Sequence, residues 1–244
     1  MIIHTTYKDV QIKIFNAKQQ TNEVLIAIHG LAGDADSSAI TAVAEQLINN
    51  NVTVVAFDLH CHGKDNNKLL QLDKCLNYIS TINNFVKENY SNKPISYFAT
   101  SFGAFLLLNY LNKTNQQVKN VVLRAPAIFI NDVLVKILHL HNSSLQQLKN
   151  KQVNISHNKE IYINFDFYED LHKKNLSKYN KKYFLHIIQG KKDDLVDYKQ
   201  NENFFQEKCD KLHKLYYFEN ADHRFKKPGE LEQIVDILKS IILQ

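Results

Sequence analysis

Two patterns of apolar and polar residues recur along the chain, and the first is the short strand-like run. Alternating or continuous apolar runs of about four to eight residues predict β-strands. These runs are Ile2–Tyr7, Val10–Phe15, Val24–Ile28, Val52–Phe57, Ile95–Phe98, Val121–Leu123, Tyr183–Ile188 and Leu215–Phe218. The first two alternate and are joined by a short link, which predicts an N-terminal β-hairpin.

The second pattern has the helical period and falls between the strands. Apolar residues recur three and four positions apart in four segments, which predicts helices there. The segments are Ala39–Asn49, 72–86, Ala104–Leu111 and 231–242. Ala104–Leu111 is apolar nearly all round, which is typical of a buried helix. Repeated alternation of strand and helix predicts a mostly parallel central sheet with helices on both faces, in a single α/β domain over residues 1–244.

Residues 130–182 break this alternation. They show no strong period, carry several aromatic residues, and contain nine lysines against five acidic residues. A long connection inside a compact α/β unit commonly covers or shapes a functional site. We expect a small cap or lid insertion within the single domain, with a poorly ordered insertion as the alternative.

Composition excludes several classes of function. The 244 residues include 30 basic and 25 acidic side chains, and the net charge of +5 forms no arginine-rich stripe, so we expect no nucleic-acid partner. The three cysteines, an odd number without metal-like spacing, indicate reduced thiols and a cytoplasmic protein. No apolar stretch approaches the roughly 20 residues of a membrane helix, and no signal peptide pattern opens the chain. The sequence leaves the oligomeric state open.

Ser101 is the first candidate for chemistry. It follows a predicted strand, precedes the buried helix, and has Gly103 two residues later. The surrounding run resembles G-x-S-x-G, with Ala99 at the first glycine, and a sharp turn there would expose the hydroxyl at the carboxyl edge of the sheet. A helix N-cap serine is the alternative interpretation.

A serine nucleophile needs a base, and the base needs an orienting carboxylate. His223 follows the last predicted strand, so it lies at the same edge of the sheet as Ser101. Asp193 follows Gly190 in the turn after the preceding strand. Asp194 and Asp197 are rivals for this position, and we rank Asp193 first and Asp194 second.

The chain resembles the α/β-hydrolase superfamily in the order Ser101, Asp193, His223 and in four further motifs. The motifs are His29-Gly30-Leu31-Ala32-Gly33 for H-G-x-x-G, Asp58 to Gly63 for D-x-x-G-H-G with Cys61 at a glycine, Gly190 to Asp193 for G-x-x-D, and the Asp222-His223 ending. Within the superfamily the chain looks most similar to cinnamoyl or feruloyl esterase-like enzymes and to serine aminopeptidase-like hydrolases.

The resemblance implies a serine hydrolase that cleaves a small-molecule carboxylic ester or thioester through an acyl-enzyme, without a cofactor. Ser101 would attack, His223 would shuttle the proton, and Asp193 would orient the imidazole. The backbone N–H groups of Leu31 and Phe102 would form the oxyanion hole. Peptidase activity, carbon–carbon bond hydrolysis and a non-catalytic binding protein on the same fold are the alternatives.

The substrate pocket is predicted less directly. We expect His29 and the insertion aromatics Phe165, Phe167 and Tyr168 to line it, although packing against the body is the alternative for the aromatics. The lysine excess of residues 130–182 hints at an anionic substrate.

Two rival constellations are disfavoured. His29, Asp58, His60 and His62 could suggest a metal, but they follow their strands and lack the closed ligand set of a structural zinc site, so we expect no metal. Cys61 lacks the strand–turn–helix context of a nucleophile.

Overall fold

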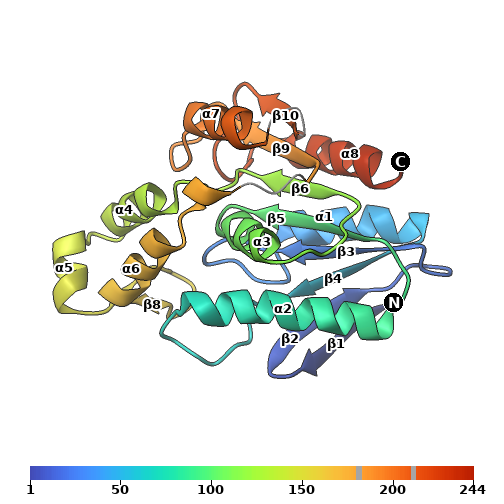
Figure 1. The fold of residues 1–244 in the computed structure, drawn as a ribbon, viewed down its shortest axis with the longest axis horizontal. Helices are drawn as coiled ribbons and strands as arrows, with labels where there is room; N and C mark the ends of the chain where they lie inside the picture. The colour runs from blue at the N-terminus through green and yellow to red at the C-terminus, as the bar shows by residue number, and fades with distance from the viewer. Residues whose placement is uncertain (180–182, 210–212) are drawn as a thin grey trace.

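A computed structural model describes residues 1–179, 183–209 and 213–244, and it is built on one eight-stranded sheet (Figure 1). The strands, in spatial order, are β1 (Ile2–Tyr7), β2 (Val10–Phe15), β4 (Val52–Phe57), β3 (Glu23–Ile28), β5 (Ile95–Thr100), β6 (Val121–Arg124), β9 (Leu185–Gly190) and β10 (His213–Phe218). β1 and β2 form an antiparallel hairpin, and β2 pairs antiparallel with β4. All pairs from β4 to β10 are parallel. The predicted mostly parallel α/β sheet with an N-terminal hairpin is therefore confirmed.

Burial explains why the central strands read as continuous apolar runs. Every residue of β3 and of β4 is buried, whereas most residues of the edge strand β1 are exposed. A parallel strand in mid-sheet is covered on both faces, so it cannot alternate between apolar and polar positions. Predicted strand 183–188 is shifted relative to β9 because the parallel pairing with β10 continues through Gly190, which lies opposite Phe218.

Helices cover the two faces of the sheet and create two cores. α1 (Ser38–Leu47) and α8 (Glu230–Ile242) pack together over one face. α2 (Leu72–Asn89) and α3 (Phe102–Lys113) cover the other face (Figure 1). A short 3-10 turn, Ile48–Asn50, follows α1. α7 (Tyr198–Lys208), which the apolar pattern did not predict, follows β9.

The insertion lies beyond the carboxyl ends of the central strands and is more regular than its sequence suggested. It contains α4 (Ile130–Leu140), α5 (Leu145–Asn150), β7 (Val153–Asn154), β8 (Tyr162–Ile163), α6 (Phe165–Lys173) and a 3-10 turn, Leu176–Lys178 (Figure 1). Its predicted end, residues 180–182, falls outside the described residues.

The insertion is tied to the body by hydrogen bonds at two places. Lys159 Nζ donates to the carbonyl of Gly63 at 2.7 Å, and Tyr162 N–H donates to the carbonyl of Lys68 at 2.7 Å. At the other place, Lys136 Nζ donates to the carbonyl of Leu195 at 2.8 Å. These bonds join the insertion to loops that follow β4 and β9.

Within the described ranges, the structure contains no helix with the length and apolar character that crossing a membrane requires.

Candidate active site

Ser101 occupies a strained turn between β5 and α3. Its backbone has φ 51° and ψ −116°, outside the regions that L-residues ordinarily adopt. The N–H of Ser101 donates to the carbonyl of Arg124 at 2.9 Å, and the Ser101 carbonyl accepts from Ala127 N–H at 3.2 Å. Hydrogen bonds to the neighbouring β6 segment therefore hold the turn in its unusual conformation. The sharp strand-to-helix turn is the one expected for a nucleophile elbow.

The elbow depends on a close approach between α3 and the end of β3. A Cβ on Gly103 would lie 2.3 Å from the carbonyl oxygen of His29, closer than any side chain can come. Only glycine at this position lets the helix start directly against the strand. The first N–H groups of α3 are consequently delivered beside the Ser101 side chain.

Three side chains from three strand ends form a hydrogen-bonded chain. His223 Nε2 lies 3.0 Å from Ser101 Oγ, and His223 Nδ1 lies 2.8 Å from Asp193 Oδ2. Because a carboxylate oxygen only accepts, Nδ1 carries the imidazole proton and Nε2 is left to accept from the serine hydroxyl. The arrangement can remove the hydroxyl proton from Ser101 as an electrophile is attacked.

Asp193 is held as an acceptor by its surroundings. Its side chain is fully buried, and Oδ1 accepts the N–H groups of Leu195 at 3.0 Å and Val196 at 2.8 Å. Gln189 Nε2 donates to Oδ2 at 3.2 Å. Three donors besides the histidine therefore satisfy the oxygens of this buried carboxylate.

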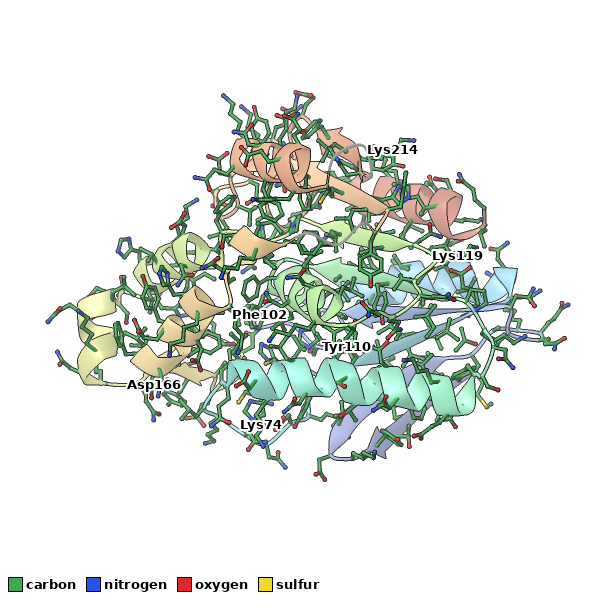
Figure 2. All side chains as sticks on the ribbon, viewed as in Figure 1. Lys74, Phe102, Tyr110, Lys119, Asp166 and Lys214 are labelled. Atoms are coloured by element: carbon green, nitrogen blue, oxygen red, sulfur yellow. The ribbon has the colours of Figure 1, made fainter. Side chains whose placement is uncertain are left out.

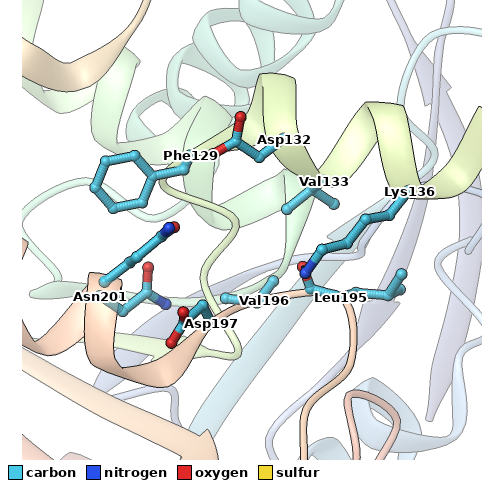
Figure 3. Close-up of a pocket in the computed structure, with 9 residues that line it drawn as sticks. Phe129, Asp132, Val133, Lys136, Leu195, Val196, Asp197 and Asn201 are labelled. Carbon is cyan, nitrogen blue, oxygen red and sulfur yellow. The ribbon is translucent and has the colours of Figure 1, made fainter.

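The two rival aspartates lie elsewhere. Asp194 is exposed, and Asp197 caps α7 by accepting the N–H of Lys199 at 2.8 Å. Asp197 also lines a separate cavity of about 370 Å³, together with Phe129 and with Lys136 of the insertion (Figure 3). Of the three candidate acids, the structure brings Asp193 to His223.

The loops that carry Asp193 and His223 are joined through their backbones. Lys191 N–H donates to the carbonyl of Phe218 at 2.9 Å, and Lys192 N–H donates to the carbonyl of Ala221 at 3.0 Å. A Cβ on Gly190 would lie 2.4 Å from the Ala221 oxygen, so the loops meet in direct contact. The acid and the base are positioned as one unit.

Backbone donors beside Ser101 come from two elements. The turn after β3 lies against the serine, since a Cβ on Gly30 would be 3.3 Å from Ser101 Cβ. Within the described residues, neither the N–H of Leu31 in this turn nor that of Phe102 at the start of α3 donates to a protein acceptor. Both N–H groups are available to an oxygen atom placed next to Ser101.

His29 braces this turn. Its Nε2 accepts the N–H of Leu59 at 3.0 Å, so Nδ1 carries the proton and donates to the carbonyl of Gly30 at 2.7 Å. Burial lowers the pKa of His29 to about 4. The ring is therefore neutral at pH 7, and both nitrogens are used by the backbone. His29 can contact a ligand in the adjoining cavity only through the rest of its side chain.

The loop after β4 holds a second set of polar side chains in backbone contacts. Asp58 accepts the N–H of Ala35 at 2.9 Å on one oxygen and that of Lys64 at 2.8 Å on the other. His62 Nδ1 bonds to the carbonyl of His60 at 2.8 Å, and burial lowers the pKa of His62 to about 3. These bonds shape the loop, and among the described residues no three His, Cys, Asp or Glu side chains are placed to hold a metal ion.

Cys61 in the same loop takes a left-handed backbone conformation, φ 67°, at the position where the superfamily motif has glycine. The side chain is buried, and burial raises the pKa of the thiol to about 12. A protonated, buried thiol is a poor nucleophile.

A cavity of about 550 Å³ opens at Ser101. The turn after β3, the start of α1, Arg124 and His223 form its body side, and His141 and residues 155–158 of the insertion form the opposite side. The place of Arg124 in this cavity was predictable from the sequence, because Arg124 ends the strand that is next to the strand before Ser101. No comparable signal marks residues 155–158.

The predicted aromatic lining differs from this finding. Among the described residues, Phe165, Phe167 and Tyr168 are absent from the cavity at Ser101. Phe167 is buried against Phe102, with ring centroids 6.2 Å apart, and Phe165 stacks on Tyr168 at 5.6 Å. Phe102, at the start of α3, is itself buried (Figure 2). These aromatics pack the insertion onto itself and onto α3, which was the alternative interpretation.

Comparison with known proteins agrees with this architecture. The sequence pattern of the family described as serine aminopeptidase, S33, matches residues 19–175, which include Ser101 but end before Asp193 and His223. No curated protein matches the chain in sequence.

Several solved structures share the fold. Est1E from Butyrivibrio proteoclasticus with bound ferulic acid has 17% sequence identity, coverage of 99% of this chain and 98% of that chain, and a TM-score of 0.82. Alpha/beta hydrolase domain-containing protein 10 from mouse has 15% identity, 99% and 98% coverage, and a TM-score of 0.76. The esterase Pf2001 from Pyrococcus furiosus has 18% identity, 99% and 88% coverage, and a TM-score of 0.70. With more than half of its length matched by the family pattern, the chain belongs to the serine aminopeptidase S33 family of α/β-hydrolases.

Proposed function

We propose that the protein is a serine hydrolase that cleaves a carboxylic ester or thioester through an acyl-enzyme on Ser101. The observation that carries the proposal is the chain of contacts from Ser101 Oγ to His223 Nε2 at 3.0 Å and from His223 Nδ1 to Asp193 Oδ2 at 2.8 Å. A non-catalytic protein on this fold would have no need to maintain such a relay beside an open cavity.

The reaction follows from the positions of the donors and acceptors. His223 Nε2 takes the hydroxyl proton as Ser101 Oγ attacks the carbonyl carbon, and the resulting imidazolium is stabilised by Asp193. The N–H groups of Leu31 and Phe102 receive the developing oxyanion, and one such donor typically lowers the barrier by about 3 kcal/mol. His223 then protonates the leaving group. Water, activated by the same imidazole, releases the acyl group from Ser101.

Peptide hydrolysis is the second candidate, and it is favoured by the description of the family as serine aminopeptidase. An aminopeptidase must bind a free ammonium group, for which a carboxylate is the usual partner. Among the described residues that line the cavity at Ser101, none is aspartate or glutamate. The charge of the cavity therefore supports an ester or thioester over a peptide with a free N-terminus.

Residues 130–182 complete the proposal as a cap within a single domain of residues 1–244. The described part of this segment supplies His141 and residues 155–158 to the cavity wall. Ile155 is buried there, so its truncation to alanine would enlarge the acyl or alcohol pocket. A changed preference between 4-nitrophenyl acetate and 4-nitrophenyl octanoate in Ile155→Ala would support a substrate-selecting cap, and an unchanged preference would count against it.

Ser101→Ala tests the reaction itself. We expect hydrolysis of short-chain 4-nitrophenyl esters and of an acyl thioester to fall by about 10⁴-fold or more, since the nucleophile is lost. A fluorophosphonate probe should label the wild-type protein on Ser101, as located by peptide mass. Ser91→Ala, at an exposed serine after α2, is the matched control and should keep both properties. Undiminished hydrolysis by pure Ser101→Ala protein, or labelling on another serine, would overturn the proposal.

A further inference from the structure

Arg124 brings a positive charge next to the nucleophile. It is the last residue of β6, and its carbonyl accepts the N–H of Ser101 at 2.9 Å, so its side chain starts beside the elbow. It lines the same cavity as Ser101 and His223. Its guanidinium carbon lies 5.4 Å from the centre of the Phe225 ring, which supports one face of the group.

Among the described residues, the guanidinium of Arg124 forms no ion pair. Nε of Arg124 is buried without a hydrogen-bond partner within the described ranges. Burial lowers the pKa of Arg124 to about 10, with Asp193 and Asp222 acting in the opposite direction, so the group is charged at pH 7. An unpaired charge in a desolvated position is costly, and an incoming carboxylate would relieve that cost.

Each of the two nearby carboxylates accepts a hydrogen bond from another donor. Asp193 bonds to His223 and to backbone N–H groups, as described above. Asp222 Oδ1 accepts the N–H of Arg224 at 2.8 Å. Asp193 and Asp222 therefore act on Arg124 only through longer-range electrostatic attraction. The guanidinium N–H groups of Arg124 remain available to a ligand.

The other charged side chains that line the cavity are also positive. Arg224 and Lys226, both exposed, also line it, and no acidic side chain is among its described lining residues. Ser37 and Ser38 bring the N-terminus of α1 to the cavity, and the first turn of this helix carries no acidic residue. The positive end of a helix dipole adds to the attraction for an anion.

We propose that the natural ester or thioester carries a second, carboxylate group, and that the guanidinium of Arg124 binds this group within the catalytic cavity. This inference rests on the proposed function and specifies its substrate class. The planar fork of arginine donors matches one carboxylate, and a cavity of about 550 Å³ holds a small acid together with the scissile bond. Arg224 and Lys226 at the rim would draw the anion in by longer-range attraction.

Two matched pairs of esters test the proposal. The first compares mono-4-nitrophenyl adipate with its methyl ester and places the charge on the acyl side. The second compares the hexanoyl ester of 4-hydroxyphenylacetate with that of its methyl ester and places the charge on the alcohol side. For wild-type protein we expect kcat/KM to favour the carboxylate member of one pair by about tenfold or more. A ratio near one in both pairs would overturn the proposal.

Arg124→Gln should lower the favoured ratio of carboxylate to neutral ester by about 10- to 100-fold, because a charged hydrogen bond is lost. Arg124→Lys keeps the charge and should retain part of the ratio. Lys18→Gln, at an exposed position on the opposite edge of the sheet, removes the same charge and should leave the ratio unchanged.

The ratio of kcat/KM between the carboxylate ester and the neutral ester distinguishes substrate binding by Arg124 from a structural role of Arg124. If Arg124 only positioned Asp193, Arg124→Gln would slow both members of a pair by the same factor, and that result would overturn the proposal. Should Arg124→Gln not fold, the wild-type ratio and Arg124→Lys still decide the question.

Failure of this inference and failure of the proposed function give different results. If Ser101 is labelled and neutral esters are hydrolysed, but the carboxylate esters are not preferred, only the inference about Arg124 is wrong. Absence of labelling and of all ester turnover would remove the proposed function.

Discussion

Two neighbouring regions at the carboxyl edge of the sheet contain the same residue types and arrange them differently. At the ends of β5, β9 and β10, His223 connects Asp193 to Ser101 through side-chain contacts. At the ends of β3 and β4, His29 and Asp58 direct their polar atoms to backbone groups, and His62 contacts backbone through Nδ1 while its Nε2 is buried without a partner among the described residues.

The difference separates two kinds of polar residue in a buried site, those that we propose to react and those that shape a loop. A buried carboxylate or imidazole that contacts backbone alone determines the shape of a loop. A buried imidazole between a carboxylate and a hydroxyl has a proton donor and acceptor that can change roles during a reaction. Residue type, burial and position at the strand edge are shared by both regions. The identity of the hydrogen-bond partner separates them.

The sharpest way to break this comparison is to replace a histidine in each region. His223→Gln should lower kcat for 4-nitrophenyl butyrate by about 10⁴-fold or more, because glutamine cannot take the hydroxyl proton. His62→Gln should keep kcat per folded molecule within about threefold, since its ring bonds to backbone. Steady-state kinetics on protein checked for folding by circular dichroism measures both. Comparable losses in the two variants would show that the regions are not functionally distinct.

The acids give the next largest difference. Asp193→Asn should lower kcat by about 10³- to 10⁴-fold, because an amide stabilises the imidazolium poorly and favours the wrong tautomer. Asp194→Asn, one residue away and exposed, should change kcat by less than about threefold. The same ester assay compares the two. A larger loss in Asp194→Asn would reassign the acid.

The region at the ends of β3 and β4 is tested by the effect of a Gly63 substitution on the free energy of unfolding. A Cβ there would lie 2.1 Å from the Asp58 carboxylate carbon, and the backbone has φ 51°. Gly63→Ala should cost about 3 kcal/mol of unfolding free energy, from backbone strain and displacement of the carboxylate from its N–H donors. Gly229→Ala is the control, because its φ is 83° but its Cβ would meet nothing closer than 4.0 Å. Equal urea midpoints for the two variants would contradict the role given to Asp58.

Acid pH should weaken the structural region through its neutral histidines. Burial lowers the pKa from 6.5 to about 4 for His29 and to about 3 for His62. The unfolded chain therefore binds more protons below about pH 6.5, and stability falls as the pH decreases. Each ring accounts for about 2 kcal/mol between pH 7 and 5. Urea unfolding at pH 7, 6 and 5 should show this decline, and His62→Gln should reduce its slope. An unchanged slope would argue against a buried neutral His62.

The parallel sheet was predictable because its signals are local. Hairpin residues Ile2–Phe15, strand Val52–Phe57 and the apolar stripe of the last helix lie where the pattern placed them. The meeting of Ser101, Asp193 and His223 was expected from the rule that carboxyl ends of parallel strands share one edge. Their catalytic roles remain a proposal.

The insertion was harder to interpret for two reasons. Ile130, Val133, Leu134 and Leu138 have helical spacing and are the buried face of α4, but lysines and aromatics around them obscure the pattern. The direction of Phe167 depends on its contact with Phe102, which lies 65 residues earlier in the sequence, and no local period reveals such a contact.

α7 was missed because its apolar face is small. Of its residues only Asn201, Phe204 and Phe205 are buried, which gives too few apolar positions to show a helical period. Asn201 is held by polar contacts, since its side-chain amide donates to the carbonyl of Pro126 at 2.8 Å. A helix anchored partly by hydrogen bonds leaves a weak hydrophobic signal.

The positive φ of Ser101 opposes folding at the position where we propose the nucleophile. A side chain at φ 51° opposes folding by about 1–2 kcal/mol, and glycine would remove that opposition. If stability alone were selected, glycine would replace Ser101, and the hydroxyl would be lost. The packing of the surrounding sheet and helices must therefore contribute more folding free energy than the strain at Ser101 costs.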